Sequence, residues 1–366
     1  MANLTAYGFI EIKDLFSQRI ITIGGETLQT ALEASLVEHT RQITAMLSGL
    51  VMKTTEFQFR YQLPAGGSLQ PLDEKGNPKV VVPSGFYNVA LPIQGAGTAW
   101  GDDRVSRAAM TFADANRYTI DALERDADWM RRHILAALFT NVTWPYTDAR
   151  YGSLTIQPLA NNDGVGYVLR GGSLDTAQNH FLAQAAALSD AANPFPTIYR
   201  ALDEHPSNSG PYIAYIPTNL VSAAQLMTST LPPQFTNLNY ASTVTLSKAL
   251  LNPDDTLRGD GPDIGFGDRY IGINSNMILV EWTSLPDNYI VAVASGASEI
   301  VGMREWEFPE LQGLFPEYFT PDGNLQVNRM IRYAGFGIVN RVGAVIDRIG
   351  NGAYAIPTGY TAPLVA

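Results

Sequence analysis

The sequence predicts an α+β fold, and three features of its hydrophobic pattern carry that prediction. Residues 53–63 alternate between apolar and polar side chains, which indicates a β-strand with one solvated face. Residues 105–139 repeat apolar side chains at helical spacing, and residues 330–349 are β-prone with glycines inside the run. Strand and helix signals therefore both occur along the chain, as in α+β proteins.

Composition excludes several classes of protein. The chain has 366 residues, 46% of them hydrophobic, so it can bury a large core. Its 24 basic and 35 acidic side chains give a net charge of −11, which argues against a primary nucleic-acid binder. It contains no cysteine, which excludes disulfides, thiolate nucleophiles and cysteine-based metal sites.

The first 50 residues predict an irregular segment followed by a helix. Residues 1–25 mix aromatic side chains, including Phe9 and Phe16, with glycines, and residues 27–50 show a helical period. The start of the chain lacks a basic region followed by an apolar run, so no signal peptide is expected. No apolar stretch reaches the roughly 18 residues of a membrane-spanning helix.

A long β-hairpin is expected next. The strand at 53–63 is followed by a turn-rich stretch at 64–78 and a second strand pattern between residues 80 and 93. An isolated two-stranded hairpin is only marginally stable, so its apolar face needs a cover. That cover is expected to be the long helix of the same subunit or a neighbouring subunit.

The helix expected at 105–139 is the strongest in the chain, and it is expected to end before Trp144 and Pro145. Asp121 and Arg125, and likewise Asp128 and Arg132, stand four residues apart and are expected to pair. Beyond the helix, the sequence predicts further elements in order. Helices are expected at 175–190, 198–202 and 220–227, with the last capped by residues 217–219, and strands at 212–216, 270–273, 277–282, 290–294 and 299–307.

No motif in the sequence selects a catalytic, cofactor-binding or metal-binding residue, so no cofactor is expected. The four histidines, His39, His133, His180 and His205, do not stand at metal-ligand spacing, and no nucleophile elbow occurs. The Asp-rich loop 252–268 could bind calcium, but no Glu closes the EF-hand spacing, which favours a solvated loop. Two Gly-x-Gly sequences occur, in GFGDRYIG and GFGIVNR. They favour close packing within strands over a phosphate-binding loop.

The order of these elements resembles that of tailed-bacteriophage major capsid proteins of the Hong Kong 97 type. Three stretches carry the resemblance at residue level: PYIAYIPTNLVSAAQLM, RYIGINSNMILVEWTSLPDNYIVAVASGASEIVGMREWEF and IRYAGFGIVNRVGAVIDRIG. The resemblance implies an N-terminal arm at 1–50, an extended hairpin or E-loop at 51–100, a peripheral domain at 101–172 and 299–350 with the spine helix 105–139, an axial domain of mixed α/β type at 173–298, and a tail at 351–366.

The function implied by this resemblance is structural, not enzymatic. Such proteins self-assemble through hexamers and pentamers into an icosahedral shell around double-stranded DNA, which the inner surface contacts non-specifically. The implied location is the virion, assembled in the host cytoplasm without a membrane, and scaffolding, portal and cement proteins are the further partners. The residues expected at contacts between subunits are Phe57, Phe59, Tyr61, Leu63, Tyr87, Val89, Leu91, Phe9 and Phe16.

Two alternatives stay open at this point. One is an encapsulin-like compartment shell, which would enclose protein cargo instead of a genome. The other is an enzyme or binding protein for polysaccharides, which would be a compact monomer or small oligomer with a carboxylate pair in one cleft. Some capsid proteins also join a hairpin Lys to an Asn of a neighbour; Lys75, Lys79, Asn340 and Asn351 have the residue types for this, but residue types alone do not establish it.

Overall fold

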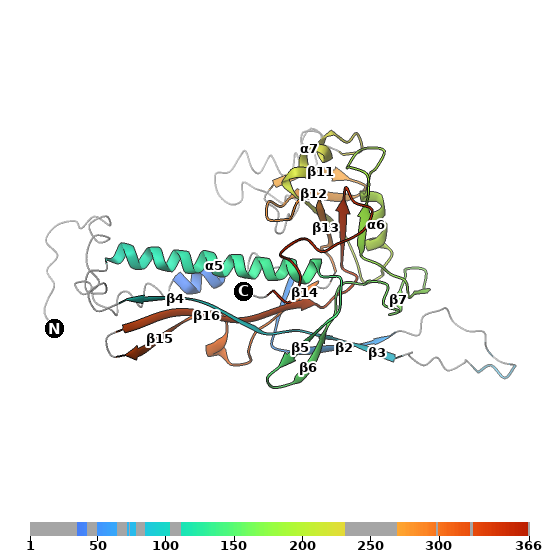
Figure 1. Ribbon diagram of the computed structural model, residues 1–366. Coiled ribbons are helices and arrows are strands. Elements are labelled where there is room, and N and C mark those ends of the chain that lie inside the picture. The colour runs from blue at the N-terminus through green and yellow to red at the C-terminus, as the bar shows by residue number, and fades with distance from the viewer. Residues whose placement is uncertain are drawn as a thin grey trace, which may run out of the picture. The chain divides into compact units, whose positions relative to one another are not determined.

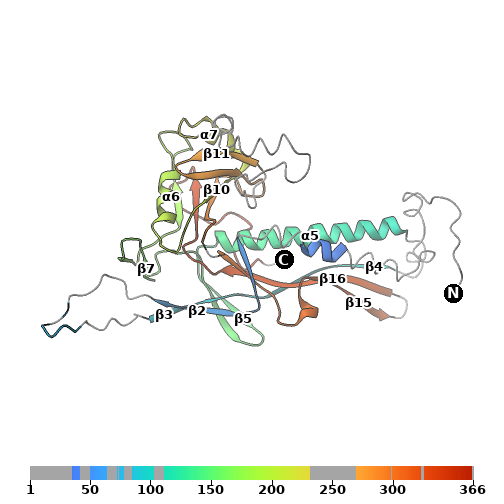
Figure 2. The same ribbon diagram turned by 180° about the vertical axis from the view of Figure 1, so that it is seen from behind.

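The computed structural model describes residues 35–41, 50–63, 72, 74–77, 85–102, 111–230, 269–297, 299–322 and 325–364 (Figures 1 and 2). The chain divides into two compact units. Unit 1 comprises Met1–Ala45, Ile93–Arg132 and Glu305–Ala334, and unit 2 comprises Met46–Pro92, His133–Arg304 and Gly335–Ala366. The predicted domain boundaries stay predictions.

Unit 1 is built from a long helix and an antiparallel sheet. The helix α5 (Phe112–Phe139) begins in this unit, and its first turn is capped by Thr111 and Asp114. The Thr111 hydroxyl donates to Asp114 Oδ2 over 2.8 Å and accepts the Asp114 backbone N–H over 3.3 Å. The strand β16 (Leu325–Ile338) pairs with β4 (Gln94–Asp102) on one side and β15 (Leu314–Asp322) on the other.

The core of unit 1 joins α5 to this sheet. Leu36 from the helical residues 35–41 packs with Ala122 of α5, Leu314 of β15 and Met330 of β16, and all four side chains are buried. A short 3₁₀-helix, η2 (Pro309–Leu311), precedes β15. The remaining part of the helix predicted at 27–50 lies outside the described residues.

Unit 2 contains a six-stranded mixed sheet with the order β11-β12-β10-β13-β17-β9. These strands are β9 (Phe181–Gln184), β10 (Tyr212–Ile216), β11 (Arg269–Asn274), β12 (Met277–Glu281), β13 (Tyr289–Ala294) and β17 (Ala344–Ile349). The helices α6 (Phe195–Asp203) and α7 (Thr218–Leu226) pack on it, with α6 beside β13 and β17 and α7 beside β11. Every residue of β10 and β13 is buried, as expected for central strands.

The rest of unit 2 consists of shorter pairings. Strand β1 (Val51–Thr54) runs parallel to β14 (Val301–Arg304), which pairs antiparallel with the last residues of β16. Three two-stranded sheets make up the remaining pairings among its described residues. They are β2 (Gln58–Leu63) with β3 (Gly85–Ala90), β5 (Trp144–Asp148) with β6 (Gly152–Ile156), and β7 (Tyr167–Val168) with β8 (Leu174–Asp175).

The helix predicted at 175–190 is wrong. That stretch holds the end of β8, an irregular segment and β9, which pairs in parallel with β17. Two side chains compete with helical hydrogen bonding: Asp175 accepts the Ala177 N–H over 2.8 Å, and Asn179 accepts the Phe181 N–H over 2.9 Å. The alanines favour a helix locally. The side-chain bonds of Asp175 and Asn179 and the pairing of β9 with β17 outweigh that preference.

The other expectations for these elements have mixed outcomes. The strand predicted at 53–63 is interrupted at residues 55–57, so β1 and β2 belong to different sheets. The long helix ends at Phe139 as predicted, before Trp144 begins β5, and its predicted start at residue 105 lies outside the described residues. Asp128 pairs with Arg131 instead of Arg132. The predicted Asp121–Arg125 pair is present at 2.9 Å. Helix α7 has no side-chain cap at its start.

Two facing glycines make room for a buried leucine in unit 2. Gly302 of β14 lies opposite Gly337 of β16, and Leu91 is fully buried over both. A Cβ on Gly302 would lie 2.6 Å from Val339 Cγ2 and 2.9 Å from Leu91 Cδ1, and one on Gly337 would lie 2.8 Å from Leu91 Cδ2. This confirms the expected close packing at the Gly-x-Gly sequence formed by Gly335, Phe336 and Gly337.

We expect Gly302→Ala to destabilise unit 2 by about 1–3 kcal/mol, because the added methyl overpacks the contact with Leu91. Gly171→Ala is the matched control, since a Cβ there meets no atom within 4 Å. Urea titration of both variants measures the free energy of unfolding. Equal midpoints for the two variants would contradict the overpacking argument.

Candidate assembly surface

The hairpin β2–β3 presents two different faces. Phe59 lies opposite Val89, and Tyr61 lies opposite Tyr87, so these side chains share one face by the two-residue period of strands. The other face carries Arg60 opposite Asn88 and Gln62 opposite Phe86. Figure 1 shows the two strands extending side by side beyond β5 and β6.

The root of the hairpin is held by a buried ion pair. The Arg304 side chain is 2% exposed, and its Nη1 donates to Asp148 Oδ2 over 2.8 Å and to the Leu91 carbonyl over 3.0 Å. The other carboxylate oxygen of Asp148 accepts the backbone N–H groups of Arg150 at 2.8 Å and Tyr151 at 3.1 Å. Burial favours the neutral acid, but these hydrogen bonds outweigh it and hold the pKa of Asp148 below its usual value.

An aromatic stack fixes the same root. Phe57 lies on Tyr151 with ring centroids 3.9 Å apart and ring planes 9° apart, and the Arg304 guanidinium lies 5.5 Å from the Tyr151 ring. The Leu91 N–H donates to the Phe57 carbonyl over 2.9 Å. The hairpin therefore leaves the body of unit 2 in a defined direction, because both of its strands are bonded at the base.

The face predicted to meet another subunit is largely covered by its own chain. Val89 and Leu91 are fully buried, while Phe57, Phe59, Tyr61 and Tyr87 are partly buried. Tyr61 stacks on Tyr87 with centroids 5.3 Å apart, and the Arg341 guanidinium lies 5.8 Å from the Tyr87 ring. Burial raises the pKa of Tyr87 to about 12, partly opposed by Arg341. Val89 and Leu91 thus serve the core of unit 2.

The exposed aromatic of the hairpin is one that the sequence analysis missed. Phe86 is 58% exposed on the opposite face, and the Arg60 guanidinium lies 4.4 Å above its ring. Arg60 Nε also donates to Asn88 Oδ1 over 3.1 Å, which orients the guanidinium. Because Phe86 and Tyr87 are adjacent in a strand, one of them had to lie on the solvated face, and that signal was available in the sequence.

Several predicted site residues are not described. Phe9, Phe16, Lys79 and the loop 252–268 lie outside the described residues, as does the side chain of Leu63. Lys75 is exposed, Asn340 is 9% exposed, and the exposed Asn351 accepts the Ala353 N–H over 3.1 Å. These positions leave the covalent linkage as the residue types left it, not established for this chain.

Unit 1 holds a second buried ion cluster. Arg332 donates to both oxygens of Asp126, over 2.5 Å from Nε and 2.8 Å from Nη2, and His39 Nε2 lies 2.9 Å from Asp126 Oδ2. Glu305 lies 3.5 Å from Arg332 Nη1. Burial opposes ionisation of Asp126, but His39 and Arg332 outweigh it and lower the pKa of Asp126. This cluster ties α5 to β16.

The described part of the chain offers neither a metal cluster nor a membrane span. Within it, no group of three or more acidic or histidine side chains is placed to hold a metal ion. None of the described helices combines the length and apolar character needed to cross a bilayer. A cavity of about 160 Å³ between α5 and the sheet of unit 1 is lined mainly by apolar side chains, with Arg125, Asp126 and Arg332 at its wall.

Comparison with known proteins adds the fold assignment. No family model and no curated protein match the sequence. The structure resembles one from Mycobacterium phage Patience, with a TM-score of 0.68 and 17% identity over 100% of this chain and 99% of that chain. It also resembles the bacteriophage PhiM1 mature capsid (TM-score 0.49, 8% identity, 82% and 85% coverage) and the capsid of cyanophage P-SCSP1u (TM-score 0.49, 9% identity, 82% and 86% coverage). The full-length likeness to the phage Patience structure confirms the predicted fold, the α+β phage capsid fold.

Proposed function

We propose that this chain is the major capsid protein of a tailed bacteriophage and that copies of it form the icosahedral shell around double-stranded DNA. The observation that carries the proposal is the likeness to the phage Patience structure over the full length of both chains. The absence of any assignable catalytic or cofactor-binding motif in the sequence is consistent with a structural role. The virion is the proposed location, with assembly in the host cytoplasm.

We infer that the outer face of the hairpin, defined by Arg60, Gln62, Phe86 and Asn88, contacts a neighbouring copy of the chain. An exposed aromatic with an arginine stacked on it is the kind of group that contributes most at protein interfaces, because it buries a large rigid surface. The buried root keeps the hairpin in one orientation, which lowers the entropic cost of binding. Identical contacts repeated around symmetry axes close into rings and then a shell.

The proposed partners follow from the same function. They are other copies of the chain in hexamers and pentamers, with scaffolding, portal and cement proteins as further candidates. The net charge of −11 suits a shell that encloses DNA without binding it tightly, because like charges repel at the inner wall. An encapsulin-like shell stays the alternative, and the contents of purified particles separate the two.

Assembly of the purified chain tests the function directly. Size-exclusion chromatography and electron microscopy are expected to show capsomers or closed particles instead of a monomer of 39.8 kDa. If the chain is a phage capsid protein, particles purified from infected or expressing cells are expected to carry nuclease-protected DNA. Protein cargo in the particles would support the encapsulin-like compartment instead. A stable monomer under all assembly conditions would overturn the proposal.

We expect Phe86→Ser to abolish or strongly reduce particle formation while leaving the subunit folded, because Phe86 is exposed within the chain and its loss removes no core contact. Val142→Ser is the matched control, since Val142 is 50% exposed in the same unit and belongs to neither β2 nor β3. Circular dichroism checks the fold, and negative-stain microscopy counts particles. Equal particle yields for the two variants would remove this face from the proposed interface.

A further inference from the structure

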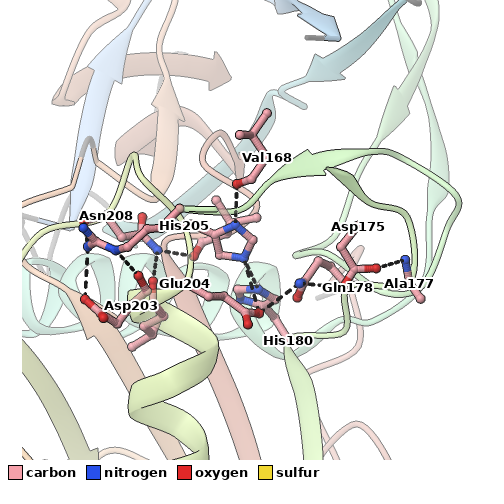
Figure 3. Close-up of polar contacts among 12 residues, drawn as sticks. Val168, Asp175, Ala177, Gln178, His180, Asp203, Glu204, His205 and Asn208 are labelled. Carbon is pink, nitrogen blue, oxygen red and sulfur yellow. Dashed lines mark hydrogen bonds and ion pairs between the residues drawn. The ribbon is translucent and has the colours of Figure 1, made fainter. Parts of the chain in front are cut away.

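Two buried histidines face each other at one end of the six-stranded sheet (Figure 3). His180 precedes β9 and His205 follows α6, and their Nε2 atoms lie 3.4 Å apart. His180 is 0% exposed and His205 is 1% exposed. Each ring also uses its other nitrogen: His180 Nδ1 lies 2.7 Å from the Ala344 carbonyl oxygen, and His205 Nδ1 lies 3.4 Å from the Val168 carbonyl oxygen.

These contacts constrain where the protons sit. A carbonyl oxygen can only accept a hydrogen bond, so a ring nitrogen that bonds to it must carry a hydrogen. Neutral imidazole carries one hydrogen, and placing it on Nδ1 of both rings leaves two Nε2 lone pairs facing each other. One additional proton between the Nε2 atoms would complete a continuous chain of hydrogen bonds from the Ala344 carbonyl to the Val168 carbonyl. Such a proton would be hydrogen-bonded within the pair, but its charge would lie in a fully buried site.

The charged groups around the pair have opposite effects on the pKa values of the two histidines. Glu204 Oε1 lies 4.0 Å from His205 Nε2, and Gln178 Nε2 donates to both Glu204 Oε1 and Asp175 Oδ2, which keeps two carboxylates beside the pair. The positive charge of Arg341 lowers the pKa of His180, and the Tyr167 ring lies 6.2 Å from the ring of His205. Both carboxylates raise the pKa of His205, against the effect of burial.

Burial decides the protonation state at neutral pH. It lowers the pKa of His180 to about 4, against the favourable bond to Ala344 and with further lowering from His205 and Arg341. Burial also lowers the pKa of His205, against Val168, Glu204 and Asp175, which raise it. The pair is therefore neutral at pH 7 and accepts a proton only in acid.

We propose that the His180–His205 pair is an acid-operated latch that joins the segment between β8 and β9 to the turn after α6. In the neutral state the two rings pack together and both segments are held by backbone bonds: the His180 N–H donates to the Ala160 carbonyl, the Arg170 N–H to the Glu204 carbonyl, and the Asn208 N–H to the His205 carbonyl. Protonation places a cation in this dry site, which is relieved when the segments separate and water enters.

The direction of the effect follows from linkage. Both histidines have folded-state pKa values below the ordinary 6.5, so their contributions to stability are complete above pH 6.5 and are lost as the pH falls below it. For His180 the loss continues down to about pH 4. Each proton excluded from the folded state raises the opening constant up to tenfold per pH unit. Between pH 6.5 and pH 4 this amounts to about two orders of magnitude for one proton.

Hydrogen exchange of the amides of residues 170, 180 and 208, corrected for the intrinsic effect of pH, tests the latch. Opening constants are expected to rise at least tenfold between pH 7 and pH 5 in the wild type and in the control His133→Gln, whose ring lies on α5. They are expected to rise much less in His180→Phe/His205→Phe, which keeps two rings but cannot bind a proton. An equal rise in the double variant would overturn the proposal.

A second measurement needs no variant. Proton-detected nitrogen spectra of the wild-type histidines are expected to show His180 and His205 titrating well below pH 6.5. A pKa at or above 6.5 for either ring would overturn the latch. So would tight stoichiometric binding of added Zn²⁺ at pH 7.5 with displacement of the His180 and His205 signals, because the occupant of the site would then be a metal ion instead of a proton.

Discussion

Replacing Arg304 with methionine is expected to destabilise unit 2 by about 3–5 kcal/mol, because it leaves the buried carboxylate of Asp148 without its counter-charge. Both side chains are at most 2% exposed, so water cannot replace the guanidinium. Methionine fills much of the arginine volume, which separates loss of charge from loss of packing. The carbonyl of Leu91 also loses its donor, and with it the hairpin loses a bond at its root.

Guanidinium or urea titration measures this loss against two controls. Arg125→Met removes half of an exposed ion pair on α5 and is expected to cost less than about 1 kcal/mol, since the Arg125 side chain is 66% exposed. Arg304→Met/Asp148→Asn is expected to recover part of the loss, because the uncompensated charge is gone. A double variant as unstable as Arg304→Met would mean that packing, not charge, holds this site.

Arg304 links the stability of the subunit to the proposed assembly. If Arg304 fixes the hairpin root, Arg304→Met should lower particle yield under conditions where the subunit is still folded. This differs from Phe86→Ser, which should lower the yield without changing the free energy of unfolding. The two variants therefore separate the orientation of the hairpin from the contact that it makes.

Elements with strong local signals could be predicted from the sequence. The buried strand at 212–216, the short helix near 198–202 and the strands at 270–273, 277–282 and 290–294 all lie where apolar runs are bounded by Pro, Gly or Asn. In these stretches the local pattern and the tertiary position agree. The Phe195-Pro196 start of α6 is an example, because proline is well suited to the first turn of a helix.

The remaining features depend on contacts distant in sequence. Nothing near residue 91 reveals that Gly302 and Gly337 open a space for Leu91, so its burial and that of Val89 could not be read from the alternating pattern. The Ala-rich stretch at 175–190 has a helical preference that the edge of β17 overrides. The histidine pair is 25 residues apart in sequence and meets only because β9 and the end of α6 lie at the same end of the sheet.

Replacing Asp347 with asparagine is expected to stabilise unit 2 at neutral pH. Asp347 lies on β17 with 3% exposure, and its Oδ1 has no hydrogen-bond partner within the described ranges. Burial raises the pKa of Asp347 to about 6, only partly opposed by the Arg348 backbone N–H. Because the folded-state pKa lies above the ordinary 3.8, the folded state loses stability as the pH rises from about 4 through 6, by about 3 kcal/mol in total.

The comparison of wild type and Asp347→Asn across pH isolates this contribution. The quantity compared is the free energy of unfolding of the variant minus that of the wild type. This difference should be up to about 3 kcal/mol more favourable to the variant at pH 7.5 than at pH 3.5. Any fixed cost of burying the amide is the same at both pH values and cancels. Asp287→Asn, at an exposed position in the same unit, is the control and should show no such dependence. A pH-independent difference between Asp347→Asn and wild type would contradict the argument.

Asp347 and the histidine pair act on stability with opposite signs in overlapping pH ranges. As the pH falls from 6.5 to 4, the histidines destabilise the folded state while protonation of Asp347 stabilises it. The wild-type chain should therefore show a shallow acid profile. In this range Asp347→Asn should lose stability more steeply than the wild type, with a slope approaching 1.4 kcal/mol per pH unit for each excluded proton. His180→Phe/His205→Phe should instead gain stability as the pH falls from 6.5 to 4, because Asp347 takes up its proton there.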